Sequence, residues 1–289
     1  MHKIENTHLR VSAREYGAEL ISIYNKASNI EHLWQADKTI WGWHSPVLFP
    51  VVGRCLNDQV TIDGTTYPMN KHGFGRRSEF KLLELSDTKM VFSLVSSADT
   101  LKSYPYRFEF LVSYRLNANT LTVAYEVVNE DVKELYFSLG GHPAFNAPFL
   151  PGEKYEDYFI EFERKENSAR HFIDINGYFD GRKEVILNNS NRLQLKDDLF
   201  KDDALIFKDL KSRKATLKSN KNNHYLSVDF TGFSYLGLWA KTNAPYVCIE
   251  PWLGCADTAN HPTGFKDKEG IIKLEGAGEF AASFKVEVG

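Results

Sequence analysis

The sequence predicts an all-β protein, built as a single large antiparallel β-sandwich with few short helices. Short runs of residues alternate between apolar and polar side chains, and a period of two is typical of half-buried strands. Aromatic residues make up 13% of the 289 residues and lie mostly in these runs. The runs follow one another without helices between them, which favours an antiparallel sandwich over parallel βαβ units.

The alternation identifies the individual strands. Residues 108–116 carry apolar side chains at every second position, and residues 121–127 repeat the pattern after a short polar turn, so they predict a β-hairpin. Residues 280–288 alternate in the same way and are expected to close a sheet. The other strand-like runs are residues 80–85, 90–95, 158–162, 215–218, 225–230, 235–239 and 246–249.

Helices are expected to be a minor component of the fold. Only residues 33–41 and 99–104 have apolar residues at helical spacing. No linker rich in Pro or Ser, no block of charge and no internal repeat divides the chain, so we expect one domain over residues 1–289.

Composition limits the partners and the compartment. Lys plus Arg number 35 against 38 Asp plus Glu, so the chain lacks the basic excess that nucleic-acid binding needs. The three cysteines, Cys55, Cys248 and Cys255, predict no disulfide framework and suit a reducing compartment. No signal peptide and no apolar run of about 20 residues is present, so we expect a cytoplasmic protein without a membrane span.

Four segments place chemically capable residues among Gly, Pro and aromatic residues at expected strand ends or loops, where functional sites are common. They are residues 49–57, 71–76, 139–146 and 248–252. In the third, His142 lies between Gly140-Gly141 and Pro143, which predicts a rigid turn around the imidazole. In the fourth, Glu250 follows an apolar run and is expected to end a buried strand. Partial burial beside Trp252 would raise its pKa and make it a usable base.

Motifs for other chemistries are absent. The sequence has no HExxH, no CxxC and no His/Cys pair at ligand spacing, so it predicts no metal site. It also lacks the GxSxG of serine hydrolases, the P-loop and a GxGxxG that opens a helix.

Taken together and in this order, four motifs resemble those of the aldose 1-epimerase (galactose mutarotase-like) family over nearly the whole chain. They are Gly53-Arg54-x-x-Asn57, His72-Gly73, Gly141-His142-Pro143-x-Phe145-Asn146 and Ile249-Glu250-Pro251-Trp252. The chain is most similar to the bacterial mutarotase-related branch found with lactose and tagatose genes. The resemblance implies a single β-sandwich, no cofactor and an open cleft that binds a small-molecule sugar.

The resemblance also implies roles for individual residues. His142 matches the general acid of the family and Glu250 its general base, while Arg54 and His72 match residues that position the sugar. The sugar-binding Asp of the family matches Asp203 best, although Asp202 is adjacent. Acid and base would open and reclose the C1–O5 bond and so interconvert the α and β anomers of an aldohexose. Such chemistry needs only proton transfer.

The segment around His72 leaves the substrate open. Lys71 and Arg76 flank the histidine, as in the hexose-6-phosphate 1-epimerase branch, and such cations suit a phosphate dianion. The small negative net charge favours the free hexose. A non-catalytic carbohydrate-binding protein with stacking tryptophans and a glycoside hydrolase using Asp203 with Glu250 are further alternatives. A monomer and a homodimer both remain possible.

Overall fold

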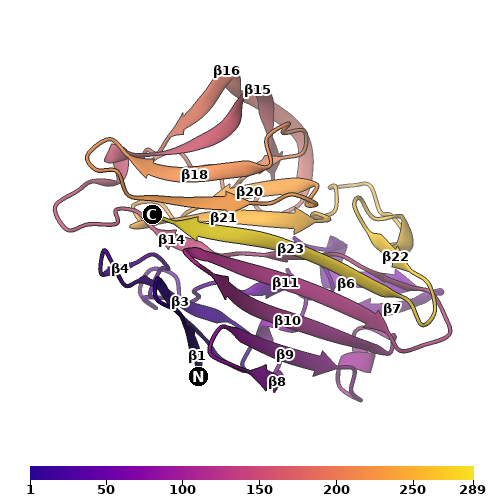
Figure 1. Ribbon diagram of the computed structural model, residues 1–289. Coiled ribbons are helices and arrows are strands. Elements are labelled where there is room, and N and C mark those ends of the chain that lie inside the picture. The colour runs from indigo at the N-terminus through magenta and orange to yellow at the C-terminus, as the bar shows by residue number, and fades with distance from the viewer.

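The computed structural model describes residues 1–289, and its regular secondary structure is almost entirely β-strand (Figure 1). The main sheet has fifteen antiparallel strands in the order β5-β13-β21-β20-β17-β15-β18-β19-β23-β11-β10-β9-β8, with β14 paired to β21 and β16 to β15. Their bounds are β5 (Val47–Leu48), β8 (Lys81–Leu85), β9 (Lys89–Val95), β10 (Phe108–Asn117), β11 (Thr120–Asn129), β13 (Leu139–Gly141), β14 (Ala144–Asn146), β15 (Tyr158–Ile173), β16 (Phe179–Gln194), β17 (Leu205–Phe207), β18 (Lys214–Ser219), β19 (Tyr225–Asp229), β20 (Tyr235–Trp239), β21 (Tyr246–Leu253) and β23 (Glu279–Val288).

Three smaller sheets pack around the main one. The first has four strands, β1 (His2–Glu5), β2 (Leu9–Ala13), β3 (Leu20–Asn25) and β4 (Ile30–Glu31). The other two are pairs, β6 (Gln59–Ile62) with β7 (Thr65–Pro68) and β12 (Leu135–Phe137) with β22 (Ile272–Leu274). The all-β antiparallel sandwich predicted from the sequence is confirmed.

The predicted hairpin is the pair β10 and β11, which pair from Phe108↔Asn129 to Asn117↔Thr120 around a two-residue turn. Its alternating apolar residues are buried on one face, from Phe108 to Leu116 and from Leu121 to Val127. They belong to one cluster of 68 buried hydrophobic residues. Because every second side chain points to the same face of a strand, the period of two in the sequence becomes the core face of the sheet.

Two expectations about local structure need correction. Residues 33–41 form no helix, and the strand at 280–288 does not close a sheet but lies inside it as β23, between β19 and β11. The helices are short 3₁₀ turns, namely η1 (Leu56–Asp58), η2 (Gly75–Arg77), η3 (Thr100–Lys102), η4 (Tyr155–Asp157) and η5 (Phe265–Asp267). Only η3 coincides with an expected helix. None of these turns has the length of a membrane-spanning helix.

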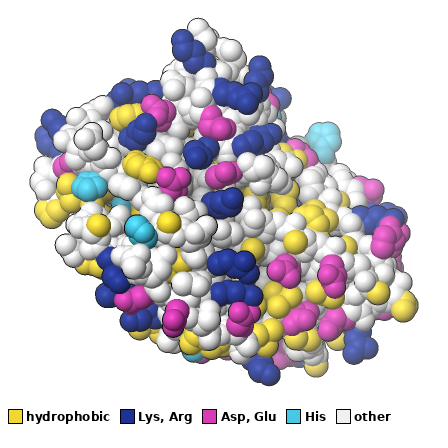
Figure 2. All heavy atoms as spheres, in the orientation of Figure 1, with side chains coloured by type: hydrophobic (Ala, Val, Ile, Leu, Met, Phe, Trp, Pro, Cys, Tyr) yellow, Lys and Arg dark blue, Asp and Glu magenta, His cyan; other side chains and the backbone are white.

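The surface carries both signs of charge. Figure 2 shows lysine and arginine side chains interspersed with aspartate and glutamate over much of one face. This mixing agrees with the near balance of 35 basic and 38 acidic residues.

Candidate active site

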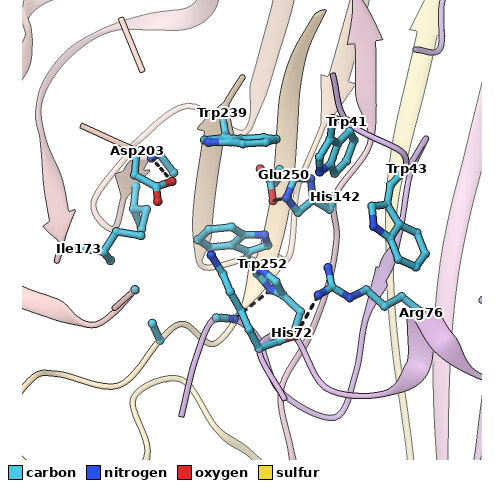
Figure 3. Close-up of a pocket in the computed structure, with 16 residues that line it drawn as sticks. Trp41, Trp43, His72, Arg76, His142, Ile173, Asp203, Trp239, Glu250 and Trp252 are labelled. Carbon is cyan, nitrogen blue, oxygen red and sulfur yellow. Dashed lines mark hydrogen bonds and ion pairs between the residues drawn. The ribbon is translucent and has the colours of Figure 1, made fainter. Parts of the chain in front are cut away.

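A cavity of about 320 Å³ lies at β20, β21 and the loops that face them (Figure 3). Its volume is at the lower end of the range for small-molecule sites, which suits a ligand of monosaccharide size. Four of the five tryptophans of the chain line it, namely Trp41, Trp43, Trp239 and Trp252. Such flat apolar rings provide stacking surfaces, and the polar residues between them provide direction.

Strand register brings His142 and Glu250 together. Both β13 and β14 pair with β21 in one register, with Leu139 opposite Leu253 and Ala144 opposite Cys248. The same register places His142, between the two short strands, directly across from Glu250. His142 Nε2 lies 3.3 Å from Glu250 Oε2, and both side chains line the cavity.

Both groups are buried, and this controls their protonation. Glu250 is 1% exposed, and burial raises the pKa of its carboxyl well above the usual range. The positive charge of Lys71 lowers this pKa, but by less than burial raises it. Burial lowers the pKa of His142 to about 3, and the charges of Arg76 and Lys71 act in the same direction. The ligand-free site therefore favours a protonated Glu250 beside a neutral imidazole.

The local backbone differs from the expectation at both residues. Glu250 does not end its strand, because β21 continues to Leu253, and Gly140 and Gly141 form a strand rather than a turn. Gly140 instead makes room for Trp252, since a Cβ at Gly140 would lie 2.8 Å from the indole. Gly237, across from Glu250 on β20, has the same role, with 2.7 Å to the other end of the ring.

Aromatic contacts hold the imidazole of His142 in place. Trp41 stacks on it with ring centroids 5.1 Å apart, and Trp239 meets it edge-on at 5.8 Å. His142 Nδ1 and Glu250 Oε2 are buried and have no hydrogen-bond partner. Buried polar atoms are normally hydrogen-bonded, so both atoms are available to a bound ligand.

His72 lies in the cavity with a defined tautomer. The Gly53 amide donates a hydrogen bond of 3.1 Å to its Nδ1, and its own amide donates to the Gly53 carbonyl. Burial lowers the pKa of His72 well below the usual range, as do the charges of Lys71 and Arg76, so the ring is neutral. Because Nδ1 accepts a bond, the proton is on Nε2, which is a donor.

Lys71 and Arg76 both line the cavity, and neither pairs with a carboxylate. The guanidinium of Arg76 lies over the ring of Trp43 and donates only to the Lys71 carbonyl. Burial lowers its pKa to about 10, with Arg77 contributing. By contrast, Arg14, Arg54, Arg170 and Arg182 each pair with an Asp or Glu.

The structure separates the two adjacent aspartates. Asp203 lines the cavity, with a backbone φ of 70° and a hydrogen bond from the Ala204 amide to its own carboxylate. Asp202 points elsewhere and pairs with Arg170 at 3.2 Å. In Figure 3, Asp203 and Arg76 lie at opposite ends of the cavity, with Glu250 and His142 between them.

Arg54 is the predicted site residue that the structure does not bring to the cavity. Its guanidinium donates to Asp58, four residues later, and to the carbonyl of Asn176. Its backbone neighbour Gly53 lines the cavity instead. The ion pair with Asp58 turns the side chain away from the cavity.

Several lining residues were not singled out as site residues from the sequence. Trp239 is the last residue of β20, Ile173 is the last residue of β15, Gly177 lies in the loop after β15, and Ile206 is in β17. Nothing in their local sequence distinguishes them from core or turn residues. Only the adjacency of β15, β17 and β20 in the sheet brings them to the cavity.

The large antiparallel sandwich places the protein in the class of galactose mutarotase-like β-sandwich proteins. The chain belongs to the aldose 1-epimerase family, whose model matches residues 1–266. It is 36% identical to the plasmid and chromosomal LacX proteins of Lactococcus lactis subsp. lactis over 281 residues, covering 94% of each chain.

Solved structures agree with this assignment. A galactose mutarotase related enzyme from Lactobacillus acidophilus matches with a TM-score of 0.95 and 35% identity, covering 100% of this chain and 97% of the other. A galactose mutarotase-like protein from Lactobacillus casei matches with a TM-score of 0.94 and 35% identity over 100% of both chains.

Proposed function

We propose that this protein is an aldose 1-epimerase that interconverts the α and β anomers of an aldohexose, with Glu250 and His142 as its proton-transfer pair. The 3.3 Å separation of His142 Nε2 from Glu250 Oε2 is the observation that carries the proposal. The C1 hydroxyl and the ring oxygen O5 are bonded to the same carbon, so groups that act on both must be close neighbours. Family membership supports the same chemistry.

Each step is a balanced proton transfer. Glu250 as carboxylate takes the proton of the C1 hydroxyl while protonated His142 gives one to O5, and the C1–O5 bond breaks to an aldehyde and a C5 hydroxyl. After rotation about C1–C2, Glu250 returns its proton to the carbonyl oxygen as His142 takes the C5 hydroxyl proton and O5 attacks the other face. The open-chain stage has protonated Glu250 and neutral His142, the state that burial favours.

Lys71 and His72 support these transfers. The charge of Lys71 opposes the raised pKa of Glu250 and so stabilises the carboxylate that starts ring opening. His72 offers an Nε2–H donor beside His142, with ring centroids 5.8 Å apart. A donor at this position would hold a sugar oxygen and orient O5 toward the imidazole.

The two ends of the cavity fit the two sides of a pyranose. On one side of C1 lies C2 with its hydroxyl O2. On the other side lies O5, which is bonded to C5 and so leads to C6. Asp203 is close enough to Glu250 to raise the pKa of its carboxyl, and Arg76 is close enough to His142 to lower the pKa of its imidazole. With Glu250 at O1 and His142 at O5, Asp203 would accept hydrogen bonds from ring hydroxyls and Arg76 would face C6.

Polarimetry on freshly dissolved α-anomers of galactose and glucose tests the proposal. We expect optical rotation to relax faster with enzyme than without, and Glu250→Gln to abolish the difference. A protein that binds the hexose by calorimetry without changing the relaxation rate would instead be a carbohydrate-binding module. Release of reducing sugar from a glycoside would support the hydrolase alternative.

A specific observation favours a second candidate, hexose-6-phosphate 1-epimerase. Arg76 and Lys71 line the cavity as cations without a carboxylate partner, and Arg76 is half-buried, a setting in which a charge is normally paired. A phosphate on C6 would supply the missing anion to the Arg76 end. Net charge does not bear on this point, because the two cations act within one cavity.

The two substrate classes are distinguished by measuring the relaxation of α-glucose and α-glucose 6-phosphate side by side. A kcat/KM at least tenfold higher for the phosphate favours the second candidate, whereas equal values favour the free hexose. Addition of inorganic phosphate is an independent check, since it should compete only if the cations bind a phosphate group.

A further inference from the structure

A third ligating side chain lies beside the acid/base pair and has no part in the proposed reaction. Cys248 is two residues before Glu250 on β21, and alternate residues of a strand share a face. Its thiol is completely buried. One nitrogen of His142, the Cys248 sulfur and one Glu250 oxygen all lie within 4.8 Å of one another.

The spacing of these three atoms suits a tetrahedral metal ion. Nitrogen and oxygen ligands at about 2.1 Å from a tetrahedral Zn²⁺ are about 3.4 Å apart, and a nitrogen and a thiolate sulfur about 3.6 Å. His142 Nε2 and Glu250 Oε2 are already 3.3 Å apart. The Cys248 sulfur needs to approach by at most about 1.2 Å, which a small rotation of the side chain provides.

We propose that His142, Cys248 and Glu250 form a binding site for a thiophilic divalent metal ion such as Zn²⁺, and that the bound ion blocks the acid/base pair. The chemical set of one imidazole, one thiolate and one carboxylate is the mixed N, S and O donor set that Zn²⁺ accepts. A thiolate also discriminates against Mg²⁺ and Ca²⁺, which prefer oxygen ligands only.

Independent features point to an ion at this position. Glu250 is 1% exposed, yet its Oε2 has no hydrogen-bond partner and faces His142. A divalent ion with one thiolate and one carboxylate forms a neutral unit, which a buried site accommodates better than a lone charge. Two of the three ligands line the cavity, so a bound ion would be reachable from it and would keep a position for water.

Inhibition is the expected consequence, and this part rests on the proposed function. A metal-bound Glu250 and His142 cannot exchange protons with O1 and O5. Zn²⁺ should therefore slow anomer interconversion, and a chelator should restore it.

Calorimetry with Zn²⁺ on chelator-treated protein tests the site without reference to activity. We expect one equivalent to bind, and Cys248→Ser and Cys248→Ala each to weaken binding at least tenfold. Cys55→Ser is the matched control, because Cys55 is also a buried thiol but lies beside Asp257 and Lys268 rather than the pair. Co²⁺ in place of Zn²⁺ should show a thiolate charge-transfer band in the wild type that both Cys248 variants lack.

The outcomes separate the two proposals. Absence of stoichiometric binding, equal binding by the Cys248 variants, or equal loss in Cys55→Ser overturns the metal site. Binding with the expected pattern in a protein without epimerase activity upholds the site and overturns the proposed function. If one Cys248 variant does not fold, the other variant and the Co²⁺ spectrum of the wild type decide.

Discussion

The guanidinium of Arg54 donates hydrogen bonds to both carboxylate oxygens of Asp58, with Nε and Nη2 at 2.7 and 2.6 Å from them. Its third contact is the carbonyl of Asn176, at 3.0 Å. The loop after β15 that contains Asn176 also contributes Gly177 to the cavity wall. Arg54 thus connects two loops at the rim of the site while its charge is neutralised by Asp58.

We expect Arg54→Ala and Asp58→Ala to have similar, small effects on sugar binding. Each removes the same ion pair, and a partly exposed pair is worth about 0–1 kcal/mol, so KM should rise by no more than about fivefold. The measurement is kcat and KM of both variants by polarimetry. A large loss in Arg54→Ala together with normal kinetics in Asp58→Ala would show direct contact between Arg54 and the sugar.

Glu250→Gln and His142→Asn should each lower kcat by about 100-fold or more, because each removes one proton-transfer group. Glutamine keeps the shape of Glu250 and removes the ionisable carboxyl from a buried position, so the melting temperature of Glu250→Gln should not fall. Polarimetry and thermal unfolding of the same preparations measure both effects. Wild-type turnover by either variant excludes that residue from the reaction.

Lys71→Ala and Arg76→Ala distinguish a phosphate site from a solvated pair of cations. If the two cations bind a phosphate group, each variant should bind glucose 6-phosphate about 10- to 150-fold more weakly and glucose almost normally, because a charged hydrogen bond to phosphate is worth about 1.5–3 kcal/mol. Calorimetry with both sugars gives the comparison. Arg77→Ala, a change at the adjacent arginine outside the cavity, is the control. Equal, small losses for both sugars argue for the free hexose.

Gly237→Ala should destabilise the protein and impair the site together. The added Cβ would lie 2.7–2.8 Å from two atoms of the Trp252 indole, so the ring or the strand must shift. Overpacking of this kind costs about 1–3 kcal/mol. Denaturant unfolding measures the loss, and Trp fluorescence reports the displacement. Gly232→Ala is the comparison, because its φ is 91° and a Cβ there meets no atom within 4 Å. It should lose stability through backbone strain without displacing Trp252.

His32, which lies outside the cavity, should make the free energy of unfolding depend on pH. Burial lowers its pKa from 6.5 to about 3, with a contribution from His224, and neither ring nitrogen has a hydrogen-bond partner. Below pH 6.5 the unfolded chain binds a proton that the folded protein excludes. The free energy of unfolding therefore falls by up to about 1.4 kcal/mol per pH unit from this residue.

The variant His32→Leu should remove that part of the acid sensitivity. Between pH 7 and pH 5, its free energy of unfolding should fall by about 2 kcal/mol less than that of the wild type. Urea unfolding at the two pH values provides the measurement. An identical fall in both proteins would mean that His32 is protonated equally in the folded and unfolded states.

The strands could be predicted from the sequence because their signal is local. In β10 and β11 the side-chain pattern alone determines which face is buried, and the short polar turn determines the pairing. Residues 33–41 show the limit of such reasoning. The amide of Trp34 donates to the carbonyl of Ala144, and Leu33 bridges Phe145, so distant residues satisfy the backbone groups that a helix would have used.

The sequence by itself determined the strand content, the family resemblance, and the identities of His142, Glu250, His72 and Asp203 as candidates. Only the tertiary structure decided which charges are partnered. Asp58 neutralises Arg54, whereas Arg76 has no carboxylate partner, and Cys248 joins His142 through the register of β21. His142 and Glu250 are 108 positions apart in the chain. Contacts over such separations depend on which strands pair and in which register, and these are set by packing of the whole sheet rather than by neighbouring residues.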